Sequence, residues 1–239
     1  MEFSVVSCHV ERPLDDRSWP LFSELQERRP GGFRIAALMR PPSEGEDGKR
    51  WLARAREASA RGPLGHHTHF VGPAHARPAT PGPEHAERVR AEAAWMRERG
   101  LEPRLFSGGG WYMDAGVAAA LAELGYADCT ATAFRPSYLP EGAPRLSLAE
   151  PTWLRLEGGL RLLELPSTHS LGMAAWASLN PASLPPYVHV YFHDTDLLSP
   201  ARRRALALAL SVLGRRRRPA ELDRLTASAE LDFSEACAP

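Results

Sequence analysis

The stretch Gly65-His66-His67-Thr68-His69-Phe70 decides the fold and the chemistry predicted for this sequence. It closes a short run that begins at Leu64 and is typical of a β-strand. Side chains two residues apart on a strand point to the same face, so His67 and His69 are expected to face the same way. Two imidazoles held in this way can bind one divalent metal ion. His66 points to the other face and is expected to be structural, and the alternative for the whole stretch is a histidine-rich surface loop.

A second pair follows the strand predicted over residues 3–8, where the sequence reads His9-Val10-Glu11. His9 and Glu11 are also two residues apart and are expected to share a face. The carboxylate of Glu11 is then a candidate third metal ligand, because two imidazoles and a carboxylate leave a coordination position open to water. The alternative is an exposed strand end at which Glu11 pairs with Arg12.

A third cluster ends the strand predicted over residues 187–192 and reads Tyr191-Phe192-His193-Asp194-Thr195-Asp196. His193 is a candidate general acid, because a carboxylate from Asp194 or Asp196 can tune the pKa of an imidazole. The alternative is a core histidine with satisfied hydrogen bonds.

A glycine-rich turn, Ser107-Gly108-Gly109-Gly110-Trp111, follows another short predicted strand. Glycines let the backbone approach a ligand closely, so the N–H groups of Gly109 and Gly110 are candidate donors to a developing oxyanion. Trp111 and Tyr112 either stack on a sugar ring or cover the core. The alternative for the turn is a plain connection between a strand and a helix.

Strands and helices alternate along the chain, which predicts an α/β fold with a mainly parallel sheet, open or closed. The polar clusters stand at the carboxyl ends of strands, where barrels and doubly wound sheets carry their chemistry. No linker divides the sequence, so one domain is expected over residues 1–239. Helices are predicted over residues 15–29, 49–60, 84–99, 114–124 and 200–213, and a hairpin over residues 153–165.

Composition excludes several classes of protein. Lys+Arg and Asp+Glu both number 29 in 239 residues, and no basic stripe interleaved with aromatic residues predicts a nucleic-acid partner. The run Arg215–Arg218 is expected to be the solvated end of a helix, with contact to an anionic surface or polymer as the alternative. Three cysteines without paired spacing, no leader and no apolar stretch of ~18 residues predict a cytoplasmic protein without a membrane span.

Taken in order, these segments resemble the polysaccharide deacetylase superfamily (NodB homology, carbohydrate esterase family 4). They are most similar to its divergent bacterial branch linked to surface polysaccharides. The resemblance covers about residues 3–200. The stretches that carry it are Cys8-His9-Val10-Glu11-Arg12-Pro13, Gly65-His66-His67-Thr68-His69, Phe106-Ser107-Gly108-Gly109-Gly110-Trp111-Tyr112, Leu121-Ala122-Glu123-Leu124-Gly125-Tyr126-Ala127-Asp128 and Val190-Tyr191-Phe192-His193.

The resemblance implies a distorted, TIM-like (β/α) barrel, often of seven strands, and metal-dependent removal of an N-acetyl group from a sugar or polysaccharide precursor. By position, Glu11, His67 and His69 would hold the metal, usually zinc. His193 would protonate the leaving amine, and a backbone N–H near Gly109 would help to stabilise the oxyanion.

Two positions depart from the family pattern. The usual aspartate base is His9 here, and the arginine that supports it is Ser107. His9 then either replaces the aspartate as a base or becomes a fourth ligand that closes the metal site. A third alternative is that Asp15 or Asp16 takes the place of the missing aspartate.

The sequence therefore predicts a metal-dependent deacetylase. One alternative is a catalytically impaired homologue that binds a metal or a sugar. Another is a different metal-assisted amidohydrolase in which His193 and Asp196 are additional ligands. The oligomeric state does not follow from the sequence.

Overall fold

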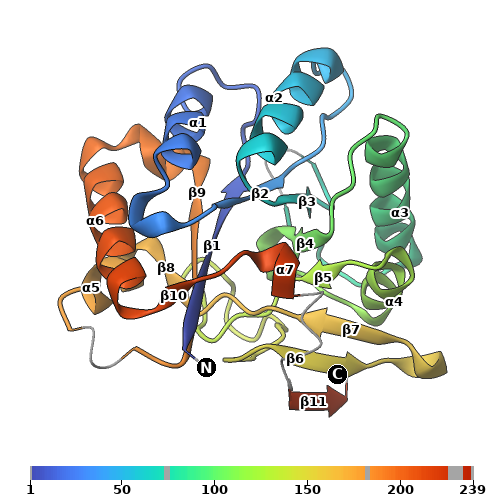
Figure 1. The fold of residues 1–239 in the computed structure, drawn as a ribbon. Coiled ribbons are helices and arrows are strands. Elements are labelled where there is room, and N and C mark those ends of the chain that lie inside the picture. Colours follow the sequence, from blue (N-terminus) through green and yellow to red (C-terminus); the bar gives the residue numbers. More distant parts are fainter. Residues whose placement is uncertain (1, 73–75, 181–183, 226–233, 238–239) are drawn as a thin grey trace.

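The computed structural model describes residues 2–72, 76–180, 184–225 and 234–237, which form an α/β fold on a mostly parallel sheet (Figure 1). The strands are β1 (Phe3–Val10), β2 (Ala36–Met39), β3 (Leu64–Thr68), β4 (Leu105–Gly108), β5 (Ala127–Asp128), β6 (Thr152–Arg155), β7 (Arg161–Glu164), β8 (His169–Ser170), β9 (Tyr187–His193), β10 (Arg218–Pro219) and β11 (Ser234–Cys237). The helices are α1 (Trp19–Arg28), α2 (Gly48–Arg61), α3 (Pro83–Arg97), α4 (Ala115–Leu124), α5 (Leu171–Ala177), α6 (Pro200–Arg216) and α7 (Leu222–Leu225). Among these helices none has the length and apolar character needed to cross a bilayer.

The predicted α/β class and parallel sheet are confirmed, but the closed seven-stranded barrel is not. The described strands form one sheet in the order β11-β6-β7-β5-β4-β3-β2-β1-β9-β8, with β10 beside β1, and no ladder joins its two ends. The chain leaves β7 for β8 through Pro166, which has no N–H to donate to a ladder. In the described chain this segment forms an isolated bridge between Thr132 and Ser167, and no ladder joins the two ends of the sheet.

Strand β1 lies in the middle of the sheet, between β2 and β9. Its eight residues, FSVVSCHV, are all buried, as expected for a parallel strand covered on both faces. One set of alternating side chains, which includes Val6 and Val10, packs in the layer with α1, α2 and α6. The other set, which includes Phe3 and Val5, packs inside the curve of the sheet with Leu222 of α7.

The parallel register brings the carboxyl ends of the strands to one edge. His9 of β1 pairs with His193 of β9, and His67 of β3 pairs with Ser107 of β4. The residues that carry the predicted chemistry therefore meet at this edge because the strands end together.

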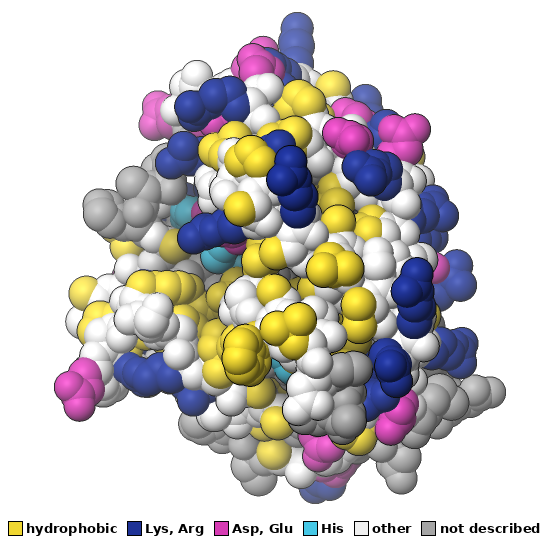
Figure 2. Space-filling view, turned by 90° about the vertical axis from the view of Figure 1, so that its left-hand side faces the viewer, with side chains coloured by type: hydrophobic (Ala, Val, Ile, Leu, Met, Phe, Trp, Pro, Cys, Tyr) yellow, Lys and Arg dark blue, Asp and Glu magenta, His cyan; other side chains and the backbone are white. Residues whose placement is uncertain are grey.

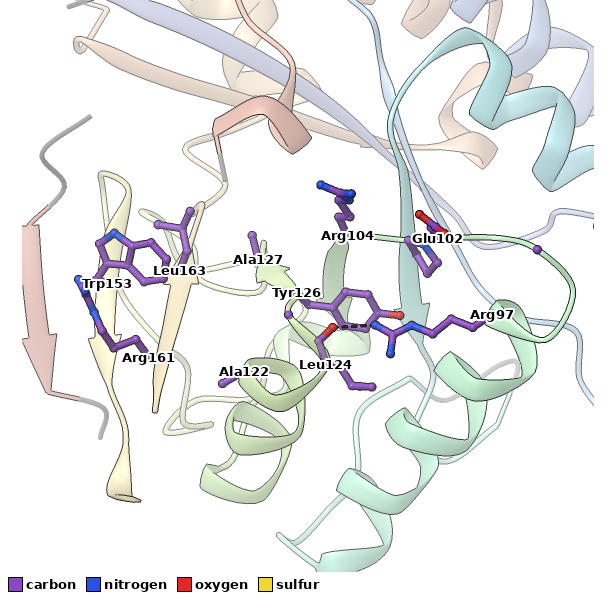
Figure 3. Close-up of a pocket in the computed structure, with 13 residues that line it drawn as sticks. Arg97, Glu102, Arg104, Ala122, Leu124, Tyr126, Ala127, Trp153, Arg161 and Leu163 are labelled. Carbon is purple, nitrogen blue, oxygen red and sulfur yellow. Dashed lines mark hydrogen bonds between the residues drawn. The ribbon is translucent and has the colours of Figure 1, made fainter. Parts of the chain in front are cut away.

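The opposite end of the strands holds a separate cavity of about 550 Å³ (Figure 3). It lies where β4, β5 and β7 begin, between Tyr126 and Trp153. Figure 3 shows the guanidinium of Arg97 directed at Tyr126, and it donates to the carbonyl oxygen of Leu124 (2.7 Å). This cavity lies away from the histidine-bearing ends of the strands.

A buried acidic pair supports the sheet beneath the glycine turn. Asp128 of β5 and Glu164 of β7 are paired across the sheet and fully buried, and two buried carboxyls side by side favour a state in which they retain a proton. Burial raises the pKa of Asp128 to about 6 and also raises the pKa of Glu164. The Thr130 hydroxyl donates to Asp128 Oδ1 (2.6 Å) and accepts from the Gly108 N–H (2.7 Å), so the pair fixes the start of the glycine turn.

The Glu164→Gln variant tests this retained proton. A raised carboxyl pKa means that the folded state keeps a proton that the unfolded chain releases above about pH 4. The contribution of the acidic pair to the free energy of unfolding should therefore fall as pH rises from about 4 through 6, by ~1.4 kcal/mol per pH unit for each retained proton. Chemical denaturation should show that the stability of the parent relative to Glu164→Gln declines over this pH range, and the exposed control Glu157→Gln should keep a constant difference from the parent. Parallel curves for the parent and Glu164→Gln would contradict the retained proton.

Candidate metal and catalytic site

The carboxylate of Glu11 lies between two imidazoles. Its Oε2 is 2.6 Å from Nε2 of His69, its Oε1 is 3.2 Å from Nε2 of His67, and the two Nε2 atoms are 3.2 Å apart. Burial by itself raises the pKa of this carboxyl, but the two histidines outweigh burial and hold the pKa well below its ordinary value. Glu11 is therefore ionised, with both oxygens directed at imidazole nitrogens.

A hydrogen bond on the side of the ring away from Glu11 fixes the orientation of His67. Its Nδ1 lies 2.8 Å from the carbonyl oxygen of Ser107, to which it donates, so Nε2 is the ring nitrogen that faces Glu11. A carbonyl partner on the second ring nitrogen is the arrangement that orients a metal-ligating histidine. His66 points the other way, as predicted, and its Nε2 lies 2.8 Å from Glu92 on α3.

His9 lies beside this group and is almost fully buried. Its ring centroid is 4.9 Å from that of His67 and 5.4 Å from that of His193, and its Nε2 is 3.5 Å from Ser107 Oγ. Burial lowers the pKa of His9 well below its ordinary value, and the neighbouring histidines lower it further. His9 is thus a neutral imidazole.

His193 faces Glu11 from β9, with Nε2 3.8 Å from Oε1. Its Nδ1 is 3.9 Å from Asp196 Oδ2, an oxygen that also accepts the His193 backbone N–H (3.0 Å). Burial lowers the pKa of His193, while Glu11 and Asp196 oppose this change. Asp196 is itself held by Arg202 (2.6 Å), so its contact with His193 comes from a fixed position.

Asp194 holds the backbone that carries Glu11, a role that the sequence does not reveal. Its carboxylate accepts the N–H groups of Glu11 (3.2 Å) and Arg12 (3.0 Å) and the hydroxyl of Ser18 (3.3 Å). Burial raises the pKa of Asp194 to about 6 in spite of these donors. Glu11 is thus positioned by the residue that follows His193.

The glycine turn packs against the histidines. A side chain at Gly109 would collide with the carbonyl oxygen of Thr68 and touch the ring of His69, so only glycine fits there. Trp111 follows with a left-handed φ of 58°, which is uncommon outside glycine. Arg77 donates to the carbonyl oxygens of Gly110 (2.8 Å) and Trp111 (3.0 Å) and fixes this conformation.

Trp111 and Tyr112 point in different directions. The ring of Trp111 is 5.6 Å from that of His9 and 4.9 Å from that of Tyr191. Tyr112 instead packs in the cluster with Phe70, and its hydroxyl donates to Asp114 (2.5 Å). The structure therefore places Trp111, and not Tyr112, beside the histidines.

A cavity of about 780 Å³ opens next to His193. Phe134 and Tyr191 are stacked in its wall, with ring centroids 5.9 Å apart, and Tyr138 and Met173 also line it. This aromatic lining suits a sugar ring or a larger apolar group. Phe134 and Tyr138 come from the irregular segment after β5, which carries no motif in the sequence.

The donor set fits a divalent metal of the zinc type. Two imidazole nitrogens and one carboxylate oxygen converge, and one imidazole has an outer hydrogen-bond partner. His9, Glu11 and His67 also offer ligand atoms within 4.8 Å of one another, so His9 stands at the edge of the same site. Asp15 and Asp16 do not join it, because they pair with Arg17 and with Arg50 and Arg54.

No family model and no curated protein matches this sequence. Solved structures do match. A "putative polysaccharide deacetylase" from Mycobacterium smegmatis aligns with 100% of this chain and 95% of its own, with a TM-score of 0.68 and 13% identity. The family 4 carbohydrate esterase from Streptomyces lividans, in complex with acetate, aligns over 98% of both chains with a TM-score of 0.55 and 11% identity.

The chain has the fold of the polysaccharide deacetylases. The expected resemblance to this superfamily is thereby confirmed as a likeness of fold. The 4-alpha-glucanotransferase from Thermococcus litoralis is also similar, over 99% of this chain but 39% of the enzyme, with a TM-score of 0.60 and 13% identity. Because a transferase shares the fold, the reaction has to be argued from the site.

Replacement of Asp194 tests its hold on Glu11. In Asp194→Asn the amide cannot accept all three donors, so two buried N–H groups compete for one oxygen. We expect unfolding to require about 2 kcal/mol less than in the parent, measured by chemical denaturation. Asp15→Asn is the control, since Asp15 bonds Arg17 at the surface, and its change should stay within about 0.5 kcal/mol. Equal stabilities for the two variants would contradict the role given to Asp194.

Proposed function

We propose that the protein is a zinc-dependent hydrolase that removes an N-acetyl group from a sugar, a polysaccharide precursor or a related amide. The observation that carries the proposal is the convergence of Glu11, His67 and His69, flanked by His9 and His193, at one end of the sheet. The fold shared with polysaccharide deacetylases supports it. A bound divalent metal supplies an acidified water and polarises a carbonyl.

The chain's own groups then have separate tasks. His9 is neutral and buried, so it can accept a proton on an imidazole nitrogen. His193 faces Glu11 from the far strand and delivers a proton to the leaving amine, with Asp196 favouring the charged imidazole. Backbone N–H groups at Gly109 and Gly110 are the donors proposed for the carbonyl oxygen, and Trp111 covers the sugar.

A second function has its own support. His9 lies close enough to Glu11 and His67 to act as a further ligand, which would close the site to water. The protein would then bind a metal or a sugar without turnover. The other amidohydrolase arrangement has less support, because Asp196 is bound to Arg202 and His193 faces Glu11.

We place the reaction in the cytoplasm. Cys8 and Cys129 are unpaired, buried thiols, which suits a reducing compartment.

Metal binding can be tested on strand β3. His67→Ala should lower zinc content, measured on the purified protein by atomic emission, from about one equivalent to near zero, because it removes one of three donors. His66→Gln is the matched control, since it changes the neighbouring histidine on the opposite face and keeps a hydrogen bond to Glu92. A parent that takes up no zinc, or a His66→Gln variant that loses it equally, would contradict the site.

The role of His9 separates the two functions. If His9 is the base, His9→Ala should lower acetate release from N-acetylated chito-oligosaccharides about 10²- to 10⁴-fold while zinc content is unchanged. If His9 is a ligand, the parent should be inactive, and His9→Ala should lower zinc affinity. Activity in His9→Asp with an inert parent would favour the second function.

A further inference from the structure

Helices α5 and α6 expose apolar side chains that the proposed chemistry does not use. Among the described residues, four of the six exposed large hydrophobic side chains lie on these helices or just after α5: Met173 (39% exposed), Trp176 (76%), Leu179 (74%) and Leu208 (61%). Trp176 lies two positions after the buried Ala174, which puts it on the outer side of α5. The two helices pack side by side, and both lie on the left-hand side of the molecule in Figure 1.

The same face is strongly basic. Between Leu197 and Ala220 the sequence has seven arginines and no acidic residue, and no acidic residue occurs between Pro166 and His193. Two of the arginines, Arg202 and Arg217, are paired with Asp196 and Glu2. Arg204, Arg215 and Arg216 form no ion pair with any described residue. Because the chain as a whole has no net charge, this concentration gives the molecule a positive side.

Apolar and basic side chains alternate along one stripe of α6. Arg204, Leu208 and Arg215 are spaced i, i+4 and i+11, so they lie within about 40° around the helix. The face turned to the viewer in Figure 2 shows hydrophobic side chains gathered across its middle with Lys and Arg around them. Histidine side chains are visible in a hollow at the edge of this face (Figure 2).

We propose that this face, made of Met173, Trp176, Leu179, Arg204, Leu208 and Arg215, docks on the surface of an anionic lipid bilayer. An exposed tryptophan and leucines beside arginines are the combination that inserts at the boundary between headgroups and acyl chains. Arginine stems bury along apolar surface while their guanidiniums reach the anionic headgroups. A soluble polyanion would use the arginines and gain nothing from the leucines, so the apolar residues favour the bilayer.

Docking of this face has a consequence for the site. The cavity next to His193 is lined by Met173 of α5 and by Ala201 and Ala205 of α6, so it borders the docking face. A bilayer against α5 and α6 would therefore lie beside the entrance to the histidines. Docking does not depend on the proposed hydrolysis. Trp176 and the stripe residues Arg204, Leu208 and Arg215 do not line that cavity.

Vesicle sedimentation tests the proposal on the full chain. The parent should bind vesicles of equal parts phosphatidylcholine and phosphatidylglycerol at least tenfold more tightly than phosphatidylcholine alone, and binding should weaken with salt. Arg204→Gln with Arg215→Gln should weaken binding about 25-fold, at roughly fivefold for each arginine. Trp176→Ser with Leu208→Ser should weaken it by at least tenfold.

Matched controls make the result specific. Arg56→Gln with Arg90→Gln removes the same charge from exposed positions on α2 and α3 and should leave binding within about twofold. If this control falls as far as Arg204→Gln with Arg215→Gln, or if the parent does not prefer the anionic vesicles, the docking face is wrong. If dextran sulfate binds as tightly and Trp176→Ser with Leu208→Ser binds vesicles like the parent, the partner is a polyanion and not a bilayer. Vesicle binding is measured without substrate, so its result is independent of whether the protein releases acetate.

Discussion

Burial of the Glu11 carboxylate between two imidazoles is the constraint around which this end of the molecule is organised. A carboxylate removed from water costs several kcal/mol unless charged or hydrogen-bonding partners replace the solvent. Here His67 and His69 provide those partners, and Asp194 holds the backbone on either side of the residue. Positioning Glu11 therefore requires a second buried acidic residue, Asp194. Both are positioned because β1 and β9 are neighbours and end together.

The meeting of the three histidine-bearing stretches follows from local sequence. Alternation along a strand assigns His67 and His69 to one face and His66 to the other, and parallel strands end at the same edge of a sheet. The same rules could not direct Tyr112, because the positive φ of Trp111 turns the chain there and the next side chain packs in the buried cluster with Phe70. Arg77 and Asp194 act through backbone atoms of distant segments, and no spacing in the sequence marks such contacts.

Local features of the fold could also be predicted from the sequence, but its long-range features could not. The hairpin of β6 and β7 and the alternation of strands and helices follow from apolar runs and glycines. Closure of the sheet depends on pairing between segments far apart in the sequence, which composition and local patterns do not reveal. The first helix starts at Trp19, later than the predicted residue 15, because residues 12–18 turn back to meet Asp194. In each case the tertiary contact overrides a reasonable local expectation.

The central place of β1 also governs how the molecule is made. Its partner β9 is separated from it by most of the chain, since Phe3 pairs with Tyr187 and His9 with His193. During synthesis β1 is made before β9, so one edge of β1 stays open until the chain has been extended through Tyr187–His193. That edge of β1 is therefore enclosed only after most of the described strands have been made. Until then it can pair with other extended segments, in this chain or in another one.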